Sequence, residues 1–247
     1  MKSTERHKLK EDEFARSVAR ARTVMEQRRS DIAKTVTIVV LVLAGAALYL
    51  WWKSSRDARA NGALAAALAT YEMPVVPPEP PKPGSPPPVP RPGTFQSQRE
   101  RLDASLPKFL EAANVYPNST PGIAARFHAA GILAELGRHS EAEQRYKEVV
   151  DKAGGTIYGT TARLGMAEAQ VAQGKYDSAI AIYSELSRDT NSTLPLDSVL
   201  MHLGRAYARA GKKEEAVRSF TRVVEEFPQS AYAADARREM EETKKRS

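Results

Sequence analysis

Four histidines and two glycine–lysine pairs are the side chains from which a reaction centre could be built in this chain. It contains no cysteine, which excludes disulfides, thiolate catalysis and cysteine-based zinc sites. Gly174-Lys175 and Gly211-Lys212 resemble the end of a phosphate-binding loop. They lack the four-residue spacer and the Ser or Thr that such a loop needs after its lysine.

The histidines do not form a plausible constellation either. His128 and His202 are 74 residues apart, on separate segments and without a nearby set of carboxylates to complete a metal site. His139 stands beside Ser140, but no third partner completes a nucleophilic triad. The sequence therefore predicts no catalytic residue, no metal site, no cofactor and no enzymatic activity.

These residues belong instead to an internal repeat of 37 residues. Each copy contains one glycine at a predicted turn between two helices: Gly137, Gly174 and Gly211. The same spacing relates small residues before the turn, alanines after it, aromatic rings one helical turn later and aliphatic residues beyond them: Ala130, Ala167 and Gly204; Ala142, Ala179 and Ala216; Tyr146, Tyr183 and Phe220; Val149, Leu186 and Val223. A glycine tolerates the positive φ with which a helix ends, and small residues let two helices approach closely. The pattern predicts stacked helix hairpins in an all-α solenoid.

In order and spacing these positions resemble the tetratricopeptide repeat family, with the third copy the best match through Leu203, Gly204, Tyr207, Phe220 and Pro228. The resemblance covers residues 123–230, as three repeats at 123–156, 160–193 and 197–230. Two copies depart from the family pattern. Arg126 and Arg163 stand where a large residue is expected early in the first helix of the pair, and Gln170 replaces an aromatic residue.

The register also extends beyond the three repeats. Phe109 lies 37 residues before Tyr146, which predicts a degenerate first helix pair within residues 53–122. An insertion at 74–93 interrupts this pair; eleven of the sixteen prolines lie in it, and we expect an exposed polyproline II segment there. Residues 231–247 read as a capping helix, which a solenoid needs at its open end.

Residues 35–52 carry no charge and are long enough for one transmembrane helix, with Tyr49, Trp51 and Trp52 at the end where a headgroup boundary would lie. Residues 1–34 hold ten Lys and Arg, whereas the other flank offers Lys53, Arg56 and Arg59 nearby. The positive-inside rule then places the N-terminus in the cytoplasm and the repeats outside, in the periplasm of a bacterium with two membranes. The alternative is a signal peptide cleaved near Arg59 or Ala60.

The leader, residues 1–34, places Phe14, Val18 and Met25 on one helical face. This favours either a solvated tail or a short amphipathic helix against anionic lipid or a cytoplasmic partner. The net charge of +7 is explained largely by the leader, which contributes +4 (ten basic minus six acidic residues). We therefore expect no nucleic-acid binding.

The tetratricopeptide resemblance implies a partner-binding groove lined by the first helix of each pair. Carried onto this sequence, the groove positions are Phe127, His128 and Gly131 in the first copy, Leu164, Glu168 and Val171 in the second, and Met201, His202, Arg205 and Arg209 in the third. Such a groove holds an extended peptide or a partner helix, and Arg205 and Arg209 would favour acidic groups.

The whole arrangement resembles the ancillary SecYEG translocon subunit family: a cytoplasmic tail, one span, an Ala-rich helix after it, then tetratricopeptide units. This implies a single-pass inner-membrane scaffold that assists protein export beside the SecYEG translocon and periplasmic chaperones. The alternatives are a scaffold for cell-division coordination or outer-membrane protein assembly, and a cleaved, soluble periplasmic peptide-binding module. Self-association through the open end of the solenoid is a further expectation.

Overall fold

The computed structural model describes residues 29–78, 91–189 and 193–245. Most of the leader, including Phe14, Val18 and Met25, most of the proline-rich insertion, and residues 190–192 lie outside this part. The chain forms two compact units, Met1–Arg56 and Asp57–Ser247. The regular structure in the described residues is helical, so the predicted all-α class is confirmed.

The first unit holds the beginning of one long helix, α2 (Arg29–Tyr71), which continues without a break into the second unit. Its apolar side chains from Val36 to Trp52 are exposed, with Trp51 retaining 70% of its surface. In the described part of the chain, it is the one helix long and apolar enough to cross a membrane; a signal sequence passes the same test.

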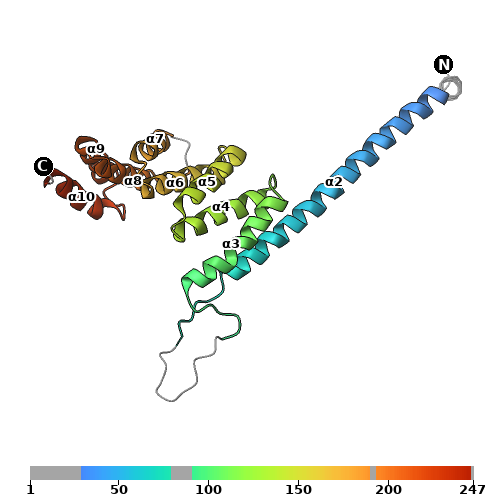
Figure 1. Cartoon of the computed structure of the whole chain (residues 1–247). Helices are drawn as coiled ribbons and strands as arrows, with labels where there is room; N and C mark the ends of the chain where they lie inside the picture. Colours follow the sequence, from blue (N-terminus) through green and yellow to red (C-terminus); the bar gives the residue numbers. More distant parts are fainter. Residues whose placement is uncertain (1–28, 79–90, 190–192, 246–247) are drawn as a thin grey trace, which may run out of the picture. The chain divides into compact units, whose positions relative to one another are not determined.

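The second unit is built of antiparallel helix pairs that follow one another along the chain (Figure 1). The last turns of α2 pair with α3 (Gln98–Val115) through a core of Ala67, Leu102, Leu106 and Phe109. Between them, a parallel bridge from Val75 to Phe95 ties together the two ends of the insertion.

Three further pairs and a last helix follow: α4 (Thr120–Glu135) with α5 (His139–Ala153), α6 (Ile157–Ala172) with α7 (Tyr176–Leu186), α8 (Leu196–Arg209) with α9 (Lys213–Glu226), and then α10 (Ala233–Lys245). The pairs begin up to three residues before the predicted boundaries at 123, 160 and 197. The reason is capping, because the Ser119 hydroxyl accepts a hydrogen bond from the Gly122 amide at 3.1 Å and Thr156 does the same for Gly159.

The three turn glycines adopt the predicted left-handed conformation, with φ of 77°, 75° and 77° at Gly137, Gly174 and Gly211. After each one, the next amide reaches back to a carbonyl five residues earlier, for example from Arg138 to Leu133 at 2.8 Å. This hydrogen bond is typical of a glycine-terminated helix and reverses the chain within about two residues. The same turn three times gives three hairpins of the same geometry.

The aromatic ring of each second helix fills the space between successive first helices. A Cβ on Gly165 of α6 would lie 2.5 Å from the Tyr146 ring of α5, and a Cβ on Gly204 would lie 2.5 Å from the Phe220 ring. Phe109, Tyr183 and Phe220 are almost fully buried. The Phe220 ring therefore requires the small residue Gly204 of its own pair, whereas the Tyr146 ring requires Gly165, which occupies the repeat position of His128 and His202.

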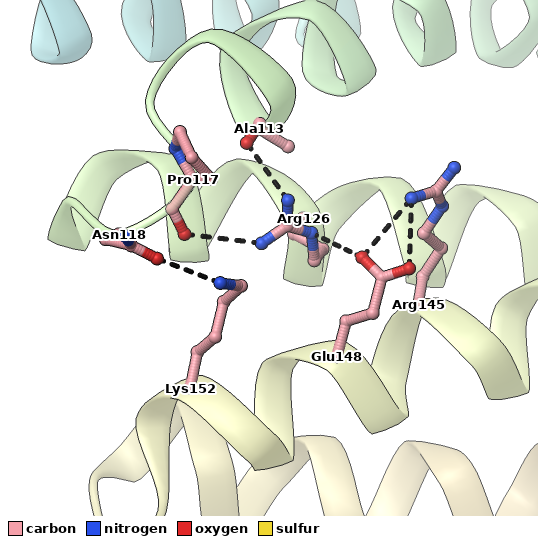
Figure 2. Close-up of polar contacts among 7 residues, drawn as sticks. All are labelled: Ala113, Pro117, Asn118, Arg126, Arg145, Glu148 and Lys152. Atoms are coloured by element: carbon pink, nitrogen blue, oxygen red, sulfur yellow. Dashed lines mark hydrogen bonds and ion pairs between the residues drawn. The ribbon is translucent and has the colours of Figure 1, made fainter.

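Arg126 takes the place of the large residue expected early in the first helix of its pair, and it is buried (Figure 2). Its guanidinium donates to the Ala113 carbonyl at 3.1 Å and to the Pro117 carbonyl at 3.4 Å. It also forms an ion pair with Glu148 at 2.8 Å. One side chain of α4 thus joins the end of α3 to α5.

The same pair recurs one repeat later, since Arg163 contacts Glu185 at 2.8 Å and both residues lie 37 positions after Arg126 and Glu148. Arg163 is more exposed, with 35% of its side chain in solvent against 5% for Arg126. In the third copy the position is Leu200, which is fully buried. The site therefore accepts either an aliphatic side chain or an arginine whose charge is matched from the paired helix.

Replacing Arg126 with alanine should lower the free energy of unfolding by about 1–3 kcal/mol, because it leaves the buried carbonyls of Ala113 and Pro117 without their donor, while Glu148 keeps its contact with Arg145. The matched Arg163→Ala change should cost about 0–1 kcal/mol, since that pair is open to solvent. Urea unfolding of the full chain in detergent micelles, followed by helical circular dichroism, compares the two variants. Equal losses would contradict the role assigned to Arg126.

Candidate functional site

The candidate site is the row of side chains on α4, α6 and α8 that the repeat resemblance marks as a groove. The structure pairs residues of successive first helices along this row. Glu168 of α6 faces His202 of α8, with a carboxylate oxygen 3.6 Å from Nε2. Arg205 of α8 donates two hydrogen bonds to Oε1 of Glu239 on α10, from Nη2 at 2.7 Å and from Nε at 2.9 Å.

These two contacts occupy equivalent positions, because Arg205 lies 37 residues after Glu168 and Glu239 lies 37 after His202. At the preceding junction, between α4 and α6, both equivalent residues are glycines, Gly131 and Gly165. There the Tyr146 ring fills the space, and its hydroxyl would lie 3.6 Å from a Cβ on Gly131. Two of the three junctions are therefore polar, and the first is aromatic.

Two histidines of the row stack on buried rings of the preceding pair. His128 lies 5.3 Å from the Phe109 ring centre, and His202 lies 5.8 Å from the Tyr183 ring centre. Burial lowers the pKa of His128. Burial, and then the positive charge of Arg205, lower the pKa of His202. Both imidazoles thus favour the neutral form, in which they pack as flat rings.

The pKa values of an acidic group on the row and of a phenol next to it are raised. Partial desolvation raises the pKa of Glu168, half of whose side-chain surface is nevertheless exposed. Burial and then the neighbouring charges of Glu168 and Glu135 raise the pKa of Tyr146 to about 12. The hydroxyl therefore remains protonated at neutral pH and can act as a hydrogen-bond donor.

Several predicted groove residues contribute to the core. Met201 is fully buried in a cluster with Leu200, Phe220 and Val223, so its assignment to the groove is wrong. Leu164 and Val171 pack against the core cluster around Tyr183. Phe127 stacks edge-on against Tyr146 and Tyr158, at 5.8 Å from each.

The arginines of the third copy line a real pocket of about 380 Å³ between α8 and α10. Its wall contains Arg205, Arg209, Arg238, Glu239 and Glu242. The charge of Arg205 is already matched by Glu239 within the chain, and the preference of Arg205 and Arg209 for acidic groups of a partner stays a prediction. Arg209 is exposed, and no hydrogen bond or ion pair of its guanidinium is present within the described residues.

Glu239 and Arg238 are site residues that the sequence reasoning missed. Both lie on α10, which was assigned only a capping role. The signal was available, because Ala233 at the start of α10 lies 37 residues after Leu196 at the start of α8. The last helix is therefore in register as the first helix of one more repeat and completes the wall of the row.

Across residues 29–78, 91–189 and 193–245, no group of three or more His, Asp or Glu side chains is placed to hold a metal ion. The polar pairs of the row are Glu168 with His202 and Arg205 with Glu239. Chemically, the arrangement can present rings, hydrogen-bond donors and charges to another chain.

Comparison with known proteins agrees with this geometry. The model of the tetratricopeptide repeat family matches residues 164–231. The nearly identical TPR-like repeats of a Podosopora anserina protein superpose with a TM-score of 0.52 at 16% identity, covering 59% of this chain and 79% of that one. A tetratricopeptide repeat protein from Parabacteroides merdae gives a TM-score of 0.50 at 16% identity, covering 59% of this chain and 55% of the other.

No curated protein matches the chain. The matched segment, the hairpin geometry and the shared fold show an α-solenoid of tetratricopeptide-type helix hairpins. The predicted repeat architecture is thereby confirmed.

The lowered pKa of His128 should make the repeats less stable in mild acid. The unfolded chain binds a proton near pH 6.5 more readily than the folded protein does, so stability is full above that pH and falls as the pH drops below it. His128→Phe keeps a ring against Phe109 and removes the titration. Between pH 7.5 and 5.5, urea midpoints of the variant should fall less than those of the parent chain, whereas identical falls would refute this origin.

Proposed function

We propose that this protein is a single-pass scaffold of the bacterial inner membrane, with its N-terminus in the cytoplasm and its tetratricopeptide repeats in the periplasm. The exposed, uncharged run from Thr35 to Trp52 supports the anchor, since exposed apolar side chains of this number need a lipid environment. The excess of Lys and Arg in residues 1–34 supports the orientation. Within such a protein the repeats bind a partner chain.

The observation that carries the binding role is the arginine-lined pocket between α8 and α10. Arg205 and Glu239 hold its wall in place, and Arg209 adds a cationic side chain that the described part of the chain does not neutralise. A guanidinium binds carboxylates in a two-pronged geometry. The partner that suits this pocket is a segment with an acidic side chain or a terminal carboxylate.

Protein export is the process that this architecture suits best, with the SecYEG translocon and periplasmic chaperones as partners. The support is the order of parts shared with ancillary translocon subunits: a cytoplasmic tail, one span, an Ala-rich helix and then repeats. The Ala-rich helix is the second half of α2, which runs directly from the span into the repeats. The alternatives, cell-division coordination or outer-membrane assembly, place the same scaffold beside different partners.

Crosslinking in cells, detergent extraction and mass spectrometry of the tagged full chain identify those partners. We expect translocon subunits and a chaperone, with recovery reduced at least tenfold by Arg209→Glu. Arg218→Glu is the matched control, because it makes the same charge change on the exposed surface of α9, at a residue that does not line this pocket.

Two results would contradict parts of this proposal. Division or outer-membrane assembly factors without translocon subunits would replace the export role and leave the scaffold. Equal recovery from the Arg209 and Arg218 variants would exclude the pocket as the binding site.

A further inference from the structure

The Tyr146 hydroxyl forms no hydrogen bond within residues 29–78, 91–189 and 193–245. It is not sealed from solvent either, although the residue keeps only 7% of its surface exposed. Polar groups that are almost wholly buried normally have a hydrogen-bond partner. A buried ring whose hydroxyl stays open and unpartnered therefore offers that hydroxyl to another molecule.

Two glycines leave this hydroxyl uncovered. A Cβ on Gly165 of α6 would lie 2.5 Å from the ring carbon Cζ, and a Cβ on Gly131 of α4 would lie 3.6 Å from the hydroxyl oxygen. The tip of Tyr146 therefore lies at a gap between the two first helices where neither helix has a side chain. One repeat later Glu168 and His202 occupy the two glycine positions, and the equivalent ring, of Tyr183, keeps only 1% of its surface exposed.

Carboxylates lie on one side of the gap. Glu135 follows Gly131 by one turn of α4, and Glu168 follows Gly165 by about one turn of α6. Helical side chains lean toward the N-terminus of their helix, so both carboxylates are inclined toward the gap. Both charges reach Tyr146, since after burial they are the causes that raise the pKa of its phenol.

Neither carboxylate forms an ion pair with a lysine or arginine in the described part of the chain. Glu135 accepts hydrogen bonds from two neutral groups, the Tyr71 hydroxyl at 3.3 Å and the Gln98 side chain at 3.2 Å. Arg101 lies over the Tyr71 ring at 5.1 Å and donates to Gln98 rather than to Glu135. The Glu135 carboxylate is thus held in position while its charge stays unmatched.

The charge of Glu168 is also unmatched. Its carboxylate faces His202, whose imidazole favours the neutral form, and half of its side chain is exposed. Arg205 on the same helix as His202 is bound to Glu239. Two negative charges therefore flank the gap without a lysine or arginine bound to them.

Aromatic rings lie on the other side of the gap. Phe127 precedes Gly131 by one turn of α4 and packs edge-on against Tyr146 and Tyr158, at 5.8 Å from each. The order along the first helices is therefore rings, an open hydroxyl and then carboxylates. A long basic side chain matches this order, because its stem packs on apolar surface while its charged head binds carboxylates.

We infer that Glu135, Tyr146 and Glu168 bind a lysine or arginine side chain of the partner protein, and we call these three residues the basic-residue site. The charged head donates hydrogen bonds to the two carboxylates and to the hydroxyl oxygen. The hydroxyl proton is then available for a backbone carbonyl of the same partner. The inference rests on the proposed binding role of the repeats, but it does not depend on the arginine pocket. It adds to the acidic group proposed for that pocket a basic residue held at the first junction.

Selection of random phage-displayed peptides by the full chain in lipid nanodiscs tests this inference. A selected peptide is then titrated beside a copy in which norleucine replaces its basic residue, so that only the charged head is lost. The protein variants are Tyr146→Phe and Glu168→Gln. Tyr146→Phe should fold normally, because the equivalent residues Phe109 and Phe220 are phenylalanines. The matched control is Tyr183→Phe, which removes the same atom one repeat later.

We expect the selected peptides to carry Lys or Arg. Each site variant should weaken binding of the basic peptide at least fivefold and of the norleucine copy less than twofold, since the lost contact involves only the charged head. Tyr183→Phe should change neither by more than twofold.

Three results would overturn the inference: selected peptides without a basic residue, equal losses for the two peptides, or equal effects of Tyr146→Phe and Tyr183→Phe. Arg209→Glu reports the arginine pocket separately. If that variant binds acidic peptides as the parent does while the basic-residue site behaves as expected, the pocket alone is rejected. If the chain selects no peptide, the binding role and the inference are rejected together.

Discussion

The fold depends on one packing constraint, which is that the ring of each second helix must fit beneath the first helix of the next pair. Phe109 meets His128, Tyr146 meets Gly165, and Tyr183 meets His202. At these three junctions the helix opposite the ring offers either a flat imidazole or no side chain at all, whereas the Phe220 ring lies against Gly204 of its own pair. This requirement sets the distance between pairs. Because it recurs every 37 residues, it converts a short helix hairpin into a stack with one direction of growth.

The polar contacts of the row follow from that stacking. Once the rings fix the spacing, residues at equivalent positions of successive first helices face each other, and the charges they carry must match. Glu168 with His202 and Arg205 with Glu239 meet this condition, and the second contact fastens α10 as the last layer. Charges are also matched within a pair, because Arg126 of α4 forms an ion pair with Glu148 of α5. The same guanidinium donates to the Ala113 carbonyl at the end of α3. The partner surface that we propose is the part these contacts leave unmatched, around Arg209 and the pocket beside it.

Structural features that follow from the spacing of residues within one repeat could be predicted from the sequence. Features that depend on the direction in which a side chain points could not. The turn glycines, the alanines that follow them and the rings are local, and the structure confirms their roles at Gly137, Gly174 and Gly211. Met201 was misplaced because one residue is about 100° of rotation on a helix, which is enough to turn a surface position into a core position. Arg126 and Gln170 looked like departures from the repeat. They become intelligible once their partners are seen: Glu148 on the paired helix for Arg126, and Glu143 on the second helix of the preceding pair for Gln170. The groove role of the remaining residues stays a prediction.

The central claim is that one chain carries a basic leader inside the cytoplasm and a repeat scaffold outside it. A small membrane-impermeant maleimide applied to intact cells tests this most directly, using the single-cysteine variants Ser17→Cys in the leader and Glu214→Cys in the first turn of α9. The account predicts that the thiol at 214 is labelled in intact cells, that the thiol at 17 is labelled only after the inner membrane is permeabilised, and that both chains retain the full mass of 27.1 kDa. A reversed labelling pattern, or a shortened chain that has lost its leader, would contradict it.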